Sequence, residues 1–129
     1  MENKSCRGLA PEYLAKHIEI LLRNPVYENP HLRSVLLFTL ARVYALDYNL
    51  GAAVGYAEMA SEISNEPLIP IRQAEWLLDA GHVREALRKL EAAERMTKNK
   101  RLKQFLYGKM LARNKQAIIN ALAQHPELN

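Results

Sequence analysis

The chain has 129 residues, of which 49% are hydrophobic and 25% are charged, and its formal net charge is +4. This length suits one domain or one array of repeats, and the composition excludes the class of intrinsically disordered proteins. The longest apolar run, at 34–41, is too short to cross a bilayer, and the first residues, MENKSCRG, lack the apolar stretch of a secretory signal. We therefore expect a soluble chain, and the sequence assigns it to no compartment.

Helical periodicity runs along the whole chain, and no stretch alternates as a half-buried strand would. After residues 1–9, which we expect to be disordered, the first predicted helix spans 11–23 and carries apolar residues at spacings of three and four. Two prolines then predict a loop at 24–30. The sequence thus predicts one helix and a loop ahead of the main array.

Two more helices are predicted at 31–46 and 50–63. The second of them is rich in alanine and glycine, and small side chains allow a neighbouring helix to come close. Gly55 within it costs about 1 kcal/mol of helix stability relative to alanine. We therefore expect the backbone at Gly55 to pack closely against another helix.

Four helices are predicted in the second half, at 70–80, 83–96, 101–112 and 115–123. Gly81 stands where a helix-ending residue with positive φ is expected. Seven helices joined by short connections predict an all-α fold built from stacked antiparallel helix hairpins.

An internal period supports this architecture. Three alanines each find another alanine 33 residues later: Ala41, Ala53 and Ala60 are followed by Ala74, Ala86 and Ala93. A fixed period in the thirties carried by small residues is typical of helical solenoids, and it favours partner binding over an active site.

On these residues the chain resembles the tetratricopeptide repeat family, whose unit is two antiparallel helices of about 34 residues. The matching positions are Leu37, Leu40, Ala41, Tyr44, Ala53 and Ala60 in one repeat, and Ala74, Leu77, Gly81, Ala86, Leu90 and Ala93 in the next. Ala57, Pro70 and Gln73 depart from the pattern.

The resemblance covers about two good repeats, within 34–99, and implies a single helical-repeat domain. Its implied parts are an extra helix and loop at 10–30, repeats at 31–66 and 67–99, and a degenerate third repeat or cap at 100–129.

First helices of successive repeats line a concave groove in this family, which binds a peptide or a partner helix. By register, the resemblance implies that this groove presents Phe38, Arg42, Ala45, Ile71, Glu75, Leu78, Leu102, Phe105 and Lys109. The set of lysines and asparagines with which chaperone-binding members hold a carboxylate is absent. Core packing of Phe38 and Phe105 stays an equal alternative, and Trp76 fits either a core or an interface.

The last quarter of the chain is basic. From 95 to 126 there are eight cations and no acid: Arg95, Lys98, Lys100, Arg101, Lys103, Lys109, Arg113 and Lys115. Such a segment attracts an acidic peptide, nucleic acid or an anionic membrane surface. The alternative is a solvated face that keeps a small domain in solution.

Residue patterns for catalysis are missing, so we expect no enzyme, no cofactor and no metal site. The four histidines lack the short paired spacing of zinc ligands, and the scattered glycines form no phosphate loop. The single cysteine, Cys6, has no partner for an internal disulfide.

The leading interpretation is a non-catalytic scaffold for protein–protein interactions that binds a peptide or a partner helix. One alternative, implied by the resemblance, is a repeat domain appended to a larger enzyme or assembly, as in bacterial membrane glycan ligases. Another is an anionic partner, nucleic acid or a membrane surface, bound by the basic quarter. A homodimer is a further alternative, in which a second copy covers apolar surface left exposed where Pro70, Gln73 and the degenerate third repeat depart from the pattern.

Overall fold

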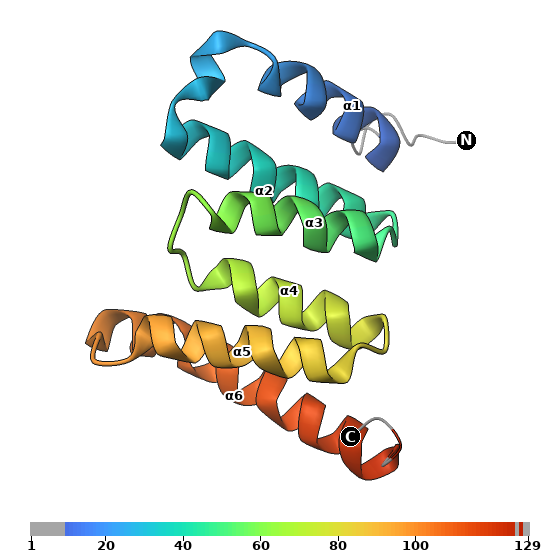
Figure 1. Cartoon of the computed structure of the whole chain (residues 1–129), viewed down its shortest axis with the longest axis vertical. Coiled ribbons are helices and arrows are strands. Elements are labelled where there is room, and N and C mark those ends of the chain that lie inside the picture. Colours follow the sequence, from blue (N-terminus) through green and yellow to red (C-terminus); the bar gives the residue numbers. More distant parts are fainter. Residues whose placement is uncertain (1–9, 126, 128–129) are drawn as a thin grey trace. The chain divides into compact units, whose positions relative to one another are not determined.

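The computed structural model describes residues 10–125 and 127, and all regular elements in this part of the chain are helices (Figure 1). The all-α fold class predicted from the periodicity is therefore confirmed. Residues 1–9, which hold Cys6 and the predicted disordered start, lie outside the described residues. Among the helices that are described, none combines the length and the apolar character needed to span a membrane.

The chain divides between Ile63 and Ser64 into two compact units. The first unit contains α1 (Pro11–Leu22), the 3-10 helix η2 (Pro25–Glu28), α2 (Pro30–Leu46) and α3 (Leu50–Ser61). The second unit contains α4 (Leu68–Asp79), α5 (Val83–Thr97) and α6 (Arg101–Gln124). The first five predicted α-helices are thus confirmed, with each end within two residues of its predicted position.

Asparagine side chains begin both helices of the first hairpin. The side-chain oxygen of Asn29 accepts hydrogen bonds from the backbone N–H groups of His31 and Leu32 at 3.0 and 3.2 Å. Asn49 caps α3 in the same way through the N–H of Ala52, at 3.3 Å. These bonds satisfy donors that have no partner inside the helix, so they fix where each helix starts.

Helices α2 and α3 form an antiparallel hairpin, and α1 packs against α2. The hairpin buries Leu37, Leu40 and Ala41 on α2 and Ala53, Ala57 and Ala60 on α3. Because the buried face of α3 carries only methyl groups at these positions, the two helix axes can approach closely. On the other side, α1 contributes Ala15 and Ile18, which pack with Leu40.

Helices α4 and α5 form a second hairpin with the same buried pattern. It buries Ala74 and Leu77 on α4 and Ala86, Leu90 and Ala93 on α5. The six alanines that define the 33-residue period are each 2% exposed or less. The period in the sequence therefore corresponds to two hairpins with equivalent cores. Trp76 is 8% exposed and belongs to the core.

The turns inside the two hairpins are also equivalent. At the end of α4, the N–H groups of Gly81 and His82 donate to the carbonyls of Leu78 and Leu77, at 3.0 and 2.8 Å. At the end of α2, Tyr48 and Asn49 donate in the same pattern, at 3.0 Å each. This is the Schellman motif, which requires a left-handed residue after the helix. Gly81 has the predicted positive φ, +86°, and Tyr48 adopts +57° at the matching position.

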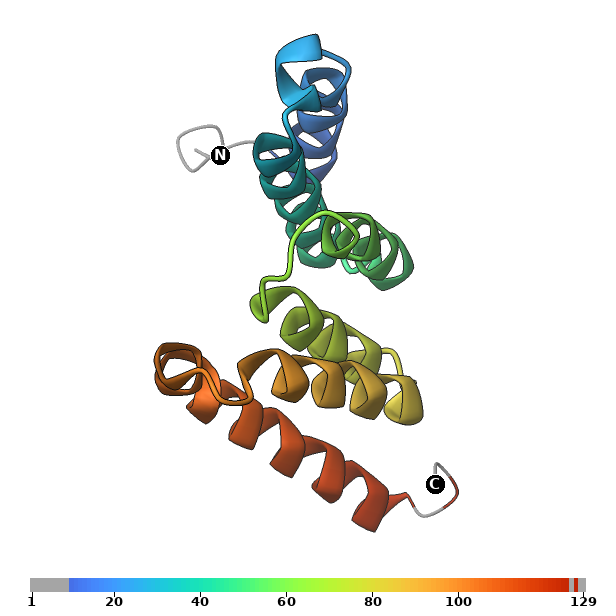
Figure 2. The same ribbon diagram turned by 60° about the vertical axis from the view of Figure 1, so that its left-hand side comes forward.

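The prediction of two helices in the last quarter was wrong, and so was the total of seven α-helices. Helix α6 runs without a break from Arg101 to Gln124, and Figure 2 shows it as one continuous coil (Figure 2). The expected break lay at Arg113 and Asn114. Asn114 instead lies inside the helix, and its side-chain amide donates to the Met110 carbonyl oxygen at 2.9 Å. The segment predicted as a degenerate third repeat therefore has one α-helix in the described part of the chain.

The expectation of close packing at Gly55 was also wrong. A Cβ placed on Gly55 meets no other atom within 4 Å, and the residue is exposed. The close approach in this helix occurs on the opposite side, at Ala53, Ala57 and Ala60. No packing observed at Gly55 offsets its cost to the helix.

Candidate partner-binding surface of the second unit

Helix α6 is attached to α4 through polar contacts two helical turns apart. The Asn114 amide donates to the Glu75 carboxylate at 3.0 Å, and the guanidinium of Arg72 lies 2.7 Å from the same carboxyl group. Two turns earlier, the Tyr107 hydroxyl donates to Glu66, which precedes α4. These contacts set the direction in which α6 runs along the second unit.

Burial raises the pKa of Tyr107 to about 12, and the hydrogen bond to the Glu66 carboxylate adds to the rise. Both causes favour the neutral phenol, because the deprotonated form would be poorly hydrated and would face a like charge. Tyr107 is therefore a neutral donor at physiological pH, and its contact with Glu66 joins α6 to the segment before α4.

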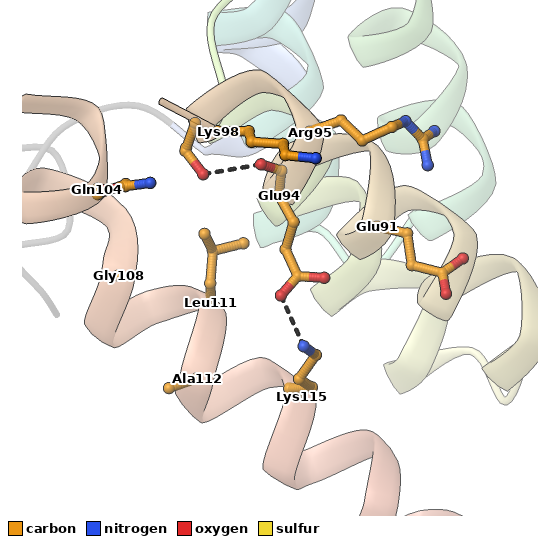
Figure 3. Close-up of a pocket in the computed structure, with 10 residues that line it drawn as sticks. Glu91, Glu94, Arg95, Lys98, Gln104, Gly108, Leu111, Ala112 and Lys115 are labelled. Atoms are coloured by element: carbon orange, nitrogen blue, oxygen red, sulfur yellow. Dashed lines mark hydrogen bonds and ion pairs between the residues drawn. The ribbon is translucent and has the colours of Figure 1, made fainter. Parts of the chain in front are cut away.

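An open cleft of about 640 Å³ lies between α5 and α6. Its apolar part comes from Gly108, Leu111 and Ala112 of α6. The remaining lining residues are polar or charged: Glu91, Glu94, Arg95, Thr97 and Lys98 before the turn, and Gln104 and Lys115 on α6. Figure 3 shows Lys115 of α6 reaching toward Glu94 of α5, and the two charged groups are 2.7 Å apart (Figure 3).

The cations around this cleft are mostly unpaired. Of the eight basic residues between 95 and 126, Lys115 alone forms an ion pair with an acidic residue in the described part of the chain. Arg95 and Lys98 line the cleft without such a partner. Because Lys115 neutralises Glu94, the cations Arg95 and Lys98 outnumber Glu91, the remaining acidic residue of the lining, and the net charge left for an incoming group is positive.

A second feature of α6 is an exposed apolar face near its start. Leu102 and Phe105, which were predicted as groove residues, are exposed, and so is the neighbouring Leu106. The buried residues of α6 are Leu111, Asn114 and Ile118. The exposure of Phe105 removes the alternative that it packs in the core.

The other predicted groove residues are distributed over both units. Phe38, Arg42 and Ala45 lie on α2 in the first unit; Arg42 is exposed, and the other two are partly exposed. On α4, Glu75 is held by Arg72 and Asn114, while Leu78 is partly exposed. Ile71, also on α4, is completely buried, so a partner cannot reach it. Lys109 is exposed on α6.

The first unit contains a polar arrangement that the sequence analysis missed. The hydroxyl groups of Tyr44 and Tyr56 both donate to the same carboxylate oxygen of Glu19, at 3.0 and 3.3 Å. The two rings are stacked, with centroids 5.4 Å apart and planes 5° from parallel. Burial and the nearby carboxylate raise the pKa of both tyrosines. This arrangement joins α1 to both helices of the hairpin.

In the described part of the chain, no group of three or more His, Cys, Asp or Glu residues is placed to hold a metal ion. His82 lies 4.0 Å from Glu85, and both side chains are more than half exposed, as expected for surface neighbours.

Comparisons with known proteins add no further assignment. No family model matches the chain, and neither the curated proteins nor the solved structures contain a match to it.

Proposed function

We propose that this chain is a non-catalytic scaffold of the tetratricopeptide repeat type that binds a segment of a partner protein. The proposal is supported by the two hairpins with equivalent buried alanines and equivalent turns, 33 residues apart. It is also supported by the packing of α6 against both α4 and α5, the arrangement expected when a third unit begins after a second.

The observation that carries the proposal is the open cleft between α5 and α6. In an array of hairpins, the helix that follows α6 would turn back and cover the side of α6 on which the cleft lies. Here α6 continues straight to Gln124, so no following hairpin helix of the described chain covers the cleft. Its volume of about 640 Å³ accommodates several side chains of an incoming segment.

The lining predicts the chemistry of that segment. Gly108, Leu111 and Ala112 provide an apolar surface with little steric hindrance, which suits apolar side chains. Arg95 and Lys98 suit an acidic residue beside them, since attraction between opposite charges orients a partner and speeds its approach. A peptide or helix with apolar and acidic positions on one face therefore fits best.

The three tyrosines with raised pKa values support a role without catalysis. Each donates a hydrogen bond to a glutamate that joins helices of one unit, and none of the three lines the cleft. A raised pKa keeps the phenol neutral, so it does not supply a base at physiological pH.

Affinity capture from the lysate of the source cell tests the proposal through a variant that fills the cleft. Ala112 lines the cleft and is exposed, so Ala112→Trp blocks it without entering the core. Ala123→Trp is the matched control, because Ala123 is exposed on the same helix and lies outside the cleft. We expect a partner that the parent chain and Ala123→Trp retain and that Ala112→Trp loses. A partner pattern unchanged by Ala112→Trp would contradict the proposal.

A further inference from the structure

The first turns of α6 present a cluster of large apolar side chains to solvent. Leu102, Phe105 and Leu106 are 70%, 83% and 55% exposed. Phe105 and Leu106 lie three and four positions after Leu102, so the three side chains lie on one side of the helix. None of them lines the cleft between α5 and α6. This apolar face is therefore a separate feature, and the proposed function does not account for it.

The fold of the second unit does not depend on these three side chains. Helix α6 is held in place by Tyr107 and Asn114 and by the buried residues Leu111 and Ile118. A large apolar side chain that stays exposed does not contribute to folding the free energy that its burial would provide. Three such residues within five positions form the kind of patch that marks an interaction site.

Cations surround the apolar face, and no acid interrupts them. Lys109 and Arg113 continue the same face of α6 one and two turns further on. Lys98, Lys100, Arg101 and Lys103 lie at or before its start, and the sequence holds no Asp or Glu from 95 to 126. None of these six cations forms an ion pair with an acidic residue in the described part of the chain.

We propose that residues 101–110 of α6 dock on an anionic lipid surface, with Leu102, Phe105 and Leu106 at the boundary between headgroups and acyl chains. The surrounding lysines and arginines contact lipid phosphates. A basic helix with Phe and Leu on one face binds membrane interfaces in this way, through apolar burial and charge attraction together. Ten residues span about 15 Å along the helix axis, which is a length suited to lying in the interfacial plane.

The form of the surface favours lipid over a protein partner. The three apolar side chains project from a helix and are not set in a cleft, so their occupant must receive them. A headgroup layer deforms around such side chains, whereas a protein partner must present a groove that fits them. The charged residues of α6 from 101 to 113 are all cations, and a continuous anionic surface complements them at once. Nucleic acid would satisfy the cations but would leave two exposed leucines without a role.

The test is co-sedimentation of the full chain with vesicles of phosphatidylglycerol and phosphatidylcholine in equal parts, against vesicles of phosphatidylcholine alone. We expect at least about tenfold stronger binding to the anionic vesicles, since each cation near such a surface contributes about 1 kcal/mol. Phe105→Ser is expected to weaken this binding about tenfold, which matches the loss of one buried aromatic side chain. Ile119→Ser is the matched control, because Ile119 is also exposed on α6 but lies beyond residues 101–110.

Each other outcome overturns the proposal. Absent vesicle binding does so directly, and binding that Phe105→Ser leaves unchanged shows charge attraction without apolar insertion. A protein partner lost from affinity capture in Phe105→Ser, with no vesicle binding, assigns the face to a protein. Oligonucleotide binding without vesicle binding assigns it to nucleic acid. Phe105→Ser also separates the two proposals, because Phe105 does not line the cleft and its loss is expected to leave a partner bound there.

Discussion

The hairpins α2–α3 and α4–α5 have equivalent cores, but each is packed against a different additional helix. Both bury three alanines at matching positions and end their first helix with the same turn. The first hairpin is covered by α1, whose Glu19 accepts hydrogen bonds from two stacked tyrosines. The second is covered by α6, which is attached through Glu66 and Glu75 and leaves an open cleft along α5.

This difference shows that the repeated pattern specifies the hairpin, while the added helix specifies the surface. Alanines at the 33-residue period allow two helices to pack closely in either unit. The covering helices share no such pattern, and each is joined to its hairpin by its own polar contacts. The candidate binding surfaces therefore lie where the repetition ends.

The largest expected effect comes from enlarging one of the matched alanines. Ala53→Leu and Ala86→Leu each place an isobutyl group in a position that is completely buried. Overpacking of this kind costs about 1–3 kcal/mol of unfolding free energy. Urea unfolding measures it, with Ala123→Leu as an exposed control on α6. A clear loss for one variant and none for the other would break the equivalence of the two cores.

Removal of the buried contact between α6 and α4 is expected to have the next largest effect. Asn114→Ala leaves Glu75 without its amide donor in a partly buried place. Loss of this hydrogen bond costs about 1 kcal/mol, because Arg72 still pairs with the Glu75 carboxylate. Asn120→Ala, at an exposed position of the same helix, provides the control for helix propensity. Equal unfolding midpoints for the two variants would show that the Asn114 contact contributes nothing to the attachment of α6.

The two equivalent turns are expected to respond with opposite signs. Gly81→Ala forces a side chain into a φ of +86° and is expected to destabilise by about 1 kcal/mol. Tyr48→Gly relieves the strain of a side chain at a φ of +57°. After the entropy cost of glycine is subtracted, we expect it to stabilise the fold by about 0.5 kcal/mol. Thermal unfolding of both variants distinguishes the signs. A stabilising Gly81→Ala would mean that the turns are not equivalent.

The last prediction concerns Tyr107 and the dependence of its contribution to stability on pH. Its pKa is about 12 in the folded chain and near 10 when unfolded. Above pH 10 the unfolded state loses this proton first, so the stabilisation present at lower pH is lost as pH rises toward 12.

Loss of the hydrogen bond in Tyr107→Phe costs about 0.5–1.5 kcal/mol at neutral pH. The stability difference between the parent chain and this variant is expected to shrink between pH 10 and 12. Urea unfolding at a series of pH values measures it, and a constant difference across that range would exclude a role for the Tyr107 proton.

Helix positions were predictable where local signals agree. Asn29, Asn49 and Gly81 mark helix ends through hydrogen bonds and backbone conformations that depend on neighbouring residues. The break expected at Asn114 was wrong, although asparagine has a low intrinsic preference for helix interiors. The Asn114 amide bonds to Glu75 on α4, and this tertiary contact is not part of the local preference.

The candidate site was predictable only in part. The basic quarter is visible in the sequence, and so is the apolar character of Leu102, Phe105 and Leu106. Their exposure is not, because residues at helical spacing fit a buried face and an exposed face equally well. Ile71 shows the reverse case, since its expected groove position is completely buried.

By itself, the sequence determined the all-α class, the two alanine-packed hairpins and the positive charge of the last quarter. These follow from periodicity, from residue size and from composition, which are local or additive properties. Only the tertiary structure decided that α6 is continuous, that tyrosines from two helices share Glu19, and that a cleft stays open beside α5. Each of these depends on contacts between residues far apart in the chain, and no pattern of spacing along the sequence encodes which of those contacts form.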